Sequence, residues 1–259
     1  NRQDKKFLFT MVVGDITDDW GYEQDFKKMN FFLSKLNTPV LYEIGNHETR
    51  LKSSFSPGYN MDEFNNYFAA QKEINGLNKL LYSFDLGKWH FIVWPDPLRK
   101  TFWDNHPHYF DWLERDIEKH KHMPVMIFQH VPVHPMGINP FLNYCETVEV
   151  KRALFDIFSK HGNVKYVLSG HIHIPVKSSF KTAVSYKGIN FINLPAAGYR
   201  PRAFGEQDYF GGPCQGAAFV DIRGEKASIT YKTVTEEEYQ YPASFPEFDT
   251  KKICALAQS

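Results

Sequence analysis

Short apolar runs that each end in a polar cluster constrain the fold of this chain more than any other feature of its sequence. The four runs are residues 7–13, 40–44, 125–128 and 164–168. The clusters that follow them are Gly14-Asp15, Gly45-Asn46-His47-Glu48, His130-Val131-Pro132 and Gly170-His171-Ile172-His173. Such runs indicate buried strands, and strands that alternate with amphipathic helices predict a mainly parallel sheet. Because open α/β sheets bind ligands beyond the carboxyl ends of their strands, we expect the four clusters to meet in one crevice.

Helical spacing and turn residues between these runs complete the outline of an α/β domain. Apolar residues at helical spacing predict helices at residues 23–36, 61–70, 109–119 and 147–161. Turn residues between apolar segments predict hairpin strands at 81–86, 89–94, 182–186, 189–194, 217–222 and 227–233, the last four forming a second, mixed sheet. We therefore expect one domain over residues 1–235 and an extended tail over 236–259 that packs on or near it.

Composition excludes several classes of protein. Lysine plus arginine and aspartate plus glutamate number 30 each among 259 residues, so no net charge favours binding to nucleic acid or to an anionic membrane. Three scattered cysteines are too few for a disulfide framework or a thiolate metal site. The sequence contains no apolar run of the roughly 18 residues that a membrane span needs and no leader, so we expect a soluble chain of unassigned compartment.

The clusters supply a carboxylate, an amide oxygen and several imidazoles, which is a mixed ligand set for divalent transition metals. In their order, and in their position after strands, the four clusters resemble the motifs of the calcineurin-like metallophosphoesterases, especially bacterial phosphodiesterase-type members. The resemblance covers most of the chain. It implies a four-layer α-β-β-α sandwich in which helices flank two mixed sheets.

The resemblance also implies roles for individual residues. Asp15 would bridge two metal ions, Asn46, His130 and His171 would complete the ligands of one ion, and His173 would bind the other. His47 would act as the catalytic general acid near the leaving group, and Asp18 would orient it. Pairing with a carboxylate favours the imidazolium form that a general acid requires.

The N-terminal part of the chain departs from the family pattern. Family members place an Asp-x-His motif on an earlier first strand, and only 13 residues precede Gly14 here. Asp104-Asn105-His106 has the right spacing but the wrong place in the order. Either the chain, which begins with Asn1, is a fragment or processed form whose intact protein holds two ions, or it is a one-metal member. In both cases one site is complete in this chain, for Mn, Fe, Zn or Co.

The function implied is hydrolysis of a small-molecule phosphodiester or phosphomonoester by attack of a metal-bound hydroxide. Asp19 stands where related Ser/Thr phosphatases have an arginine, and Asp18 where purple acid phosphatases have a tyrosine, which disfavours both branches. The alternative is a non-catalytic or one-metal binding protein with a degenerate fold. Residues near the motifs that remain open as substrate contacts are His134, Tyr199, Arg200 and Arg202. The other histidines are expected at the surface or at helix ends: His106, His108, His120, His122 and His161.

Overall fold

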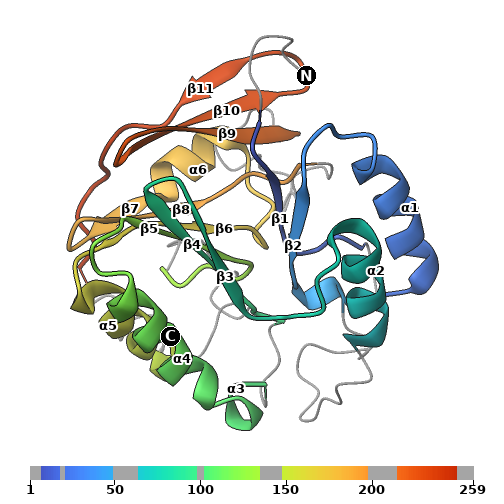
Figure 1. The fold of residues 1–259 in the computed structure, drawn as a ribbon. Coiled ribbons are helices and arrows are strands. Elements are labelled where there is room, and N and C mark those ends of the chain that lie inside the picture. The colour runs from blue at the N-terminus through green and yellow to red at the C-terminus, as the bar shows by residue number, and fades with distance from the viewer. Residues whose placement is uncertain are drawn as a thin grey trace.

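The described strands form three hydrogen-bonded sheets (Figure 1). The computed structural model describes residues 7–17, 21–48, 64–97, 102–134, 148–197 and 215–249. Strand β1 (Thr10–Val13) pairs in parallel with β2 (Val40–Glu43). A six-stranded sheet has the order β3 (Tyr82–Leu86), β4 (Trp89–Trp94), β5 (Val125–Gln129), β6 (Val164–Ser169), β8 (Ile189–Asn193) and β7 (Val184–Tyr186). The antiparallel third sheet contains β9 (Gly216–Arg223), β10 (Lys226–Thr233) and β11 (Glu238–Gln240).

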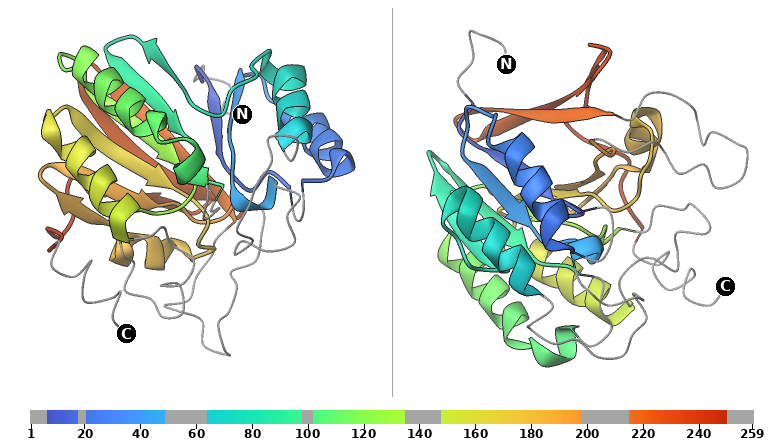
Figure 2. Two further views of the ribbon diagram at one scale, coloured as in Figure 1. Left: turned by 90° about the horizontal axis from the view of Figure 1, so that it is seen from below. Right: turned by 90° about the vertical axis from the view of Figure 1, so that its right-hand side faces the viewer.

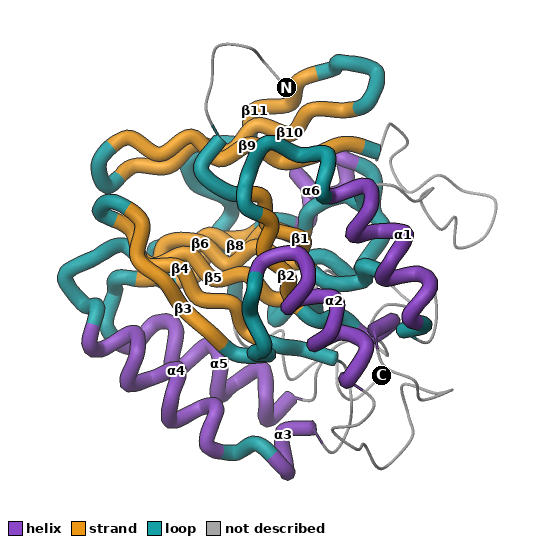
Figure 3. Tube along the Cα trace, turned by 45° about the vertical axis from the view of Figure 1, so that its right-hand side comes forward, coloured by secondary structure: helices purple, strands orange, loops and turns teal. Residues whose placement is uncertain are grey.

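Two helix pairs cover the sheets from different sides (Figures 2 and 3). Helices α1 (Glu23–Leu33) and α2 (Asn65–Asn75) lie beside β2. Helices α4 (His108–Lys119) and α5 (Val148–Lys160) pack on one face of the six-stranded sheet. The shorter helices are a 3-10 turn (Asn46–Glu48), α3 (Phe102–Asn105) and α6 (Val176–Thr182). No helix in the described part of the chain is long and apolar enough to span a membrane.

Strand β5 shows why the central sheet is apolar on both faces. All five of its residues are buried. Val125 and Ile127 pack in the core shared with the helices, whereas Met126 and Phe128 pack in a second core between the sheets. Alternate residues of a strand point to opposite faces, so a strand covered on both faces needs apolar residues throughout.

The second core joins the sheets to one another. Phe9, just before β1, contacts Phe91 of β4 at 5.4 Å and Phe128 of β5 at 6.4 Å between ring centroids. Ile229 and Tyr231 of β10 are buried in the same cluster. The predicted α/β fold of helices and several sheets is therefore confirmed. The predicted second, mixed sheet is wrong in its membership: β7 and β8 extend the six-stranded sheet next to β6, and β9, β10 and β11 form a separate sheet that is purely antiparallel.

The structure also differs from the sequence predictions in places. Helix α1 ends at Leu33, before the predicted end at residue 36, and helix α6 was not predicted. Residues 61–63 of the predicted second helix, and 147 of the predicted fourth, lie outside the described residues. Beyond residue 236, β11 pairs with β10, and Glu247 forms a parallel bridge with Ser185. The division into domain and tail stays a prediction.

Candidate metal centre

The loops that follow β1, β2, β5 and β6 carry the predicted ligands. Asp15 comes two residues after β1, Asn46 begins the 3-10 turn after β2, and His130 directly follows β5. Asp15 and His171 have backbone φ angles of 50° and 67°, which non-glycine residues seldom adopt. Such backbone geometry persists where surrounding contacts enforce it, and it is often found at functional sites.

His130 stands at the centre of the group. Its side chain is fully buried, and its Nδ1 donates a hydrogen bond to the Val13 carbonyl oxygen at 2.9 Å. Its Nε2 lies 3.1 Å from Asp15 Oδ1 and 3.1 Å from Asn46 Oδ1. Metal binding requires the neutral ring with its proton on Nδ1, in which Nε2 is an acceptor that faces two acceptor oxygens. A cation between them satisfies all three atoms, so these residues fit a metal ion.

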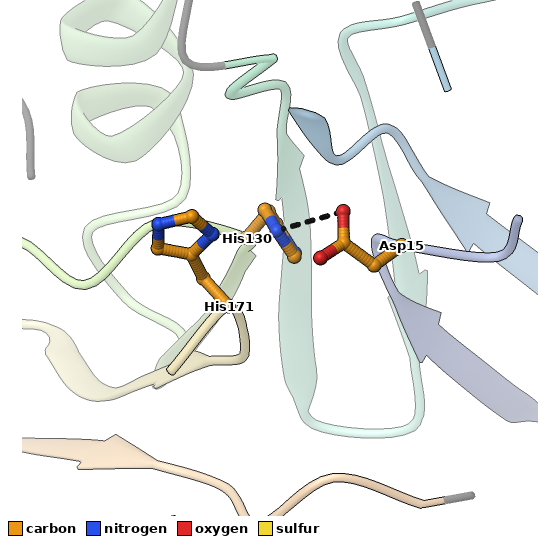
Figure 4. Close-up of side chains that lie close together, drawn as sticks. All are labelled: Asp15, His130 and His171. Atoms are coloured by element: carbon orange, nitrogen blue, oxygen red, sulfur yellow. Dashed lines mark ion pairs between the residues drawn. The ribbon is translucent and has the colours of Figure 1, made fainter. Parts of the chain in front are cut away.

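His171 closes the group from the side of β6 (Figure 4). Its ring centroid lies 5.0 Å from that of His130, and one ligand atom each of Asp15, His130 and His171 lie within 4.8 Å of one another. Together with the amide of Asn46, these atoms make the mixed nitrogen and oxygen set that suits Mn, Fe, Zn or Co. Four of the predicted ligands thus come together around His130.

The remaining predicted residues are less completely placed. His173 is not a member of the group of ligand atoms formed by Asp15, His130 and His171 among the described residues. Asp18 lies outside the described residues, as do Tyr199, Arg200 and Arg202. The side chain of His134 is 1% exposed, so it lies in the core.

His47 lies at the edge of this group. Its Nε2 is 3.9 Å from Asp15 Oδ2, and its backbone N–H donates a hydrogen bond to Asp15 Oδ1 at 3.1 Å. The His47 side chain keeps 22% of its surface exposed, whereas that of His130 has none. Its ring is therefore accessible to a molecule in solvent while lying against the ligand carboxylate.

Glu48 was not predicted as a functional residue, although the motif that contains it was visible. Its buried carboxylate accepts hydrogen bonds from the backbone N–H groups of Asp15 at 2.9 Å, Thr17 at 2.9 Å and Gly45 at 2.6 Å. Burial and the neighbouring Asp15 carboxylate raise the pKa of Glu48. Glu48 therefore joins the loop after β1 to the loop after β2. A carboxylate that directly follows a ligand and a histidine was the available signal.

Two glycines permit the close approach of these loops. A Cβ atom on Gly14, whose φ is +71°, would lie 2.3 Å from His130 Nδ1. A Cβ atom on Gly45 would lie 2.4 Å from both the backbone nitrogen and Oδ1 of Asp15. Neither position has space for a side chain, so the glycines in these motifs are required by packing.

Asp15 and His130 shift each other's pKa. Burial raises the pKa of the Asp15 carboxyl, but the positive charge and hydrogen bond of His130, together with His47 and His171, outweigh it and hold the pKa well below its usual range. Burial lowers the pKa of His130, but Asp15 outweighs this effect and raises it. Asp15 is therefore an anion under ordinary conditions, as a metal ligand must be.

Comparison with known proteins places these motifs in a wider context. The sequence model described as calcineurin-like phosphoesterase matches residues 2–175. A protein of Nostoc sp. named 3′,5′-cyclic-nucleotide phosphodiesterase is 25% identical over 169 residues, which cover 63% of this chain and 54% of that protein. The match thus spans about half the length of the curated relative.

Two solved structures share the fold. A dimetal phosphatase from Danio rerio has a TM-score of 0.57 and 15% identity, and the match covers 91% of this chain and 84% of that one. A purple acid phosphatase from yellow lupin (Lupinus luteus) seeds has a TM-score of 0.67 and 14% identity, over 96% of this chain and 48% of that one. At these identities the likeness concerns the fold alone.

Proposed function

We propose, because the chain belongs to the calcineurin-like phosphoesterase family, that it hydrolyses phosphodiesters of small molecules with the help of divalent metal ions. The observation that carries the proposal is the convergence of Asp15, Asn46 and His130, with Nε2 of His130 at 3.1 Å from an oxygen of each partner. The name of the Nostoc relative supports a diester over a monoester as the substrate.

Asp15, Asn46, His130 and His171 would hold one ion, and His173 would be one ligand of a second ion that Asp15 bridges. When bound, such ions polarise a phosphoryl oxygen and activate water for attack. The protein contributes the orientation of the ligands. The Val13 carbonyl accepts the Nδ1 proton of His130 and so would leave Nε2 available to hold an ion.

His47 would donate a proton to the leaving-group oxygen. The proposal is supported by its partial exposure, which allows contact with a substrate, and by its position 3.9 Å from Oδ2 of the candidate ligand Asp15. The backbone hydrogen bond from His47 to Asp15 fixes the start of its side chain relative to the ligands. Asp18 would orient the ring, a role that stays a prediction.

Leaving-group dependence tests this assignment. We expect His47→Ala to lose about 10²- to 10⁴-fold in rate on phenyl diesters, whose leaving group needs a proton, and much less on p-nitrophenyl diesters. Metal content measured by elemental analysis should stay unchanged. The exposed histidine variant His122→Ala is the matched control and should behave like the unaltered chain. An equal loss on both esters would contradict the acid role.

Turnover itself distinguishes the proposed enzyme from a binding protein. The purified chain is supplied with Mn²⁺ and assayed on bis(p-nitrophenyl) phosphate and on p-nitrophenyl phosphate. We expect faster hydrolysis of the diester, and loss of that activity in Asp15→Asn. No turnover of either compound, together with one tightly bound ion per chain, would refute hydrolysis and support a one-metal binding protein.

A further inference from the structure

A second cluster of histidines and carboxylates lies at the opposite end of the six-stranded sheet from His130. It consists of Asp85 at the end of β3, His90 near the start of β4, and Asp116 and His120 on and directly after α4. His90 pairs with Val125, the first residue of β5, whereas His130 follows the last residue of that strand. Five residues of strand separate the two levels, or roughly 16 Å.

His90 is the buried centre of this cluster. Its side chain is 1% exposed, and both ring nitrogens face carboxylates. Nε2 lies 2.8 Å from Asp116 Oδ2, and Nδ1 lies 2.6 Å from Asp85 Oδ1. Asp116 is itself mostly buried, with 12% of its side chain exposed, whereas Asp85 is 53% exposed. The ring is thus held from inside the protein by one carboxylate and meets the other toward solvent.

His120 lies flat against His90. The two ring centroids are 3.7 Å apart and the planes differ by 11°. His120 Nδ1 donates a hydrogen bond to the Asp116 carbonyl oxygen at 2.7 Å, and its Nε2 lies 3.9 Å from Asp85 Oδ1. A carbonyl oxygen only accepts, so the proton of the neutral ring is on Nδ1 and a lone pair is on Nε2.

We propose that Asp85 Oδ1, His90 Nδ1 and His120 Nε2 form a binding site for a divalent transition metal such as Zn²⁺, separate from the candidate metal centre. One ligand atom from each of the three residues lies within 4.8 Å of the others. The opposite nitrogen of each histidine is held by Asp116, through its carboxylate for His90 and its backbone oxygen for His120. Zinc-ligating histidines generally have such a partner on the second nitrogen.

The exposure of Asp85 gives an ion a route to the site and leaves a fourth position for water, as in open zinc sites. An ion lies near the plane of each ring that binds it, so the His120 ring would have to tilt out of its present stack on His90. In the absence of an ion, a His90 ring protonated on both nitrogens donates one hydrogen bond to Asp85 and one to Asp116. Zn²⁺ binding at Nδ1 would release the Nδ1 proton to solvent and leave the Nε2 proton hydrogen-bonded to Asp116, which is the usual linkage between metal binding and protonation.

Zinc stoichiometry tests the proposal on the full chain, with Zn²⁺ alone as the probe. Equilibrium dialysis at pH 7 should show that the unaltered chain binds one more Zn²⁺ than His120→Ala does. The neighbouring exposed variant His122→Ala is the matched control and should keep the extra ion. Asp85→Asn, changed at a half-exposed position, should lose it as His120→Ala does. Equal stoichiometry in the full chain and both site variants would overturn the site.

Proton release provides a second readout that a purely structural cluster would not change. Calorimetric titration of Zn²⁺ in two buffers of different ionisation enthalpy measures protons released. We expect the full chain and His122→Ala to release one proton more than His120→Ala. Zn²⁺ should also raise the unfolding temperature of the unaltered chain by more than it raises that of Asp85→Asn. The variant would retain only the stabilisation that comes from the candidate metal centre. Identical proton release in all variants would refute coordination by His90.

Discussion

Replacing Glu48 by glutamine tests whether this buried carboxylate holds the candidate metal centre together. Its Oε2 accepts the N–H groups of Asp15 and Gly45, and its Oε1 accepts that of Thr17. Glutamine retains one acceptor oxygen and presents an NH₂ group in place of the other. If the oxygen stays with Asp15 and Gly45, the NH₂ group faces the Thr17 N–H at about the present 2.9 Å, where two donors repel each other.

The cost follows from these contacts. One charge-assisted hydrogen bond is lost, worth about 1.5–3 kcal/mol, and two others become neutral and roughly half as strong. Relief from burying a carboxylate offsets part of this loss. We expect Glu48→Gln to lower the free energy of unfolding by about 3 kcal/mol. Because the Asp15 loop loosens, the affinity for Mn²⁺ should fall about 10- to 100-fold.

Urea unfolding followed by tryptophan fluorescence measures the first quantity, and Mn²⁺ titration measures the second. Glu118→Gln makes the same chemical change at an exposed position of α4 and should leave both measurements unchanged. If Glu48→Gln unfolds at the same urea concentration as the full chain and binds Mn²⁺ as tightly, the carboxylate does not join the two loops and the reasoning is wrong.

Three further predictions concern packing and pH. Gly45→Ala places a Cβ 2.4 Å from the Asp15 backbone nitrogen, so we expect about 1–3 kcal/mol of destabilisation and weaker Mn²⁺ binding, and unchanged Mn²⁺ affinity would disprove the clash. Burial, with the nearby Lys151 charge, lowers the pKa of His134 to about 4. The unfolded chain takes up that proton near pH 6.5, so stability falls by about 3 kcal/mol between pH 6.5 and 4, and urea titrations of His134→Asn should lack this loss. Burial lowers the pKa of His90, but Asp116 and Asp85 outweigh it and raise the pKa. In chelator-treated protein, the difference in unfolding free energy between the unaltered chain and His90→Gln should therefore be greatest below pH 6.5. It should decline as the pH rises through the folded-state pKa of His90. A difference that does not vary with pH would contradict a charged ring.

The sequence predicted the elements whose signals are local. The apolar runs at β5 and β6 were predicted as strands because continuous burial leaves a continuous apolar pattern. Helix α4 was predicted from its apolar spacing. Helix α6 was missed because Val176–Thr182 is short and mostly polar, and its signal was Pro175 directly before the first helical residue.

Contacts between residues far apart in the sequence could not be predicted from such local signals. The hydrogen bond from the Asp15 N–H to Glu48 joins residues 33 positions apart, and His90 meets Asp116 across 26 positions. His120 and His134, expected at the surface or near a substrate, are 9% and 1% exposed. Contacts with distant strands contribute to this burial: the His120 ring stacks on His90 of β4, and the His134 ring centroid lies 6.0 Å from that of Phe191 of β8.

The order of motifs along the chain determined which ligand types would be delivered to the ends of the strands, since a strand and the turn after it are encoded by adjacent residues. Only the tertiary structure decided which of those ligands lie close enough to bind one ion. It also identified Glu48 as the residue that joins the loops after β1 and β2. The physical reason is that strand formation depends on local spacing, whereas the meeting of side chains depends on how separate sheets and helices bury their apolar faces against one another.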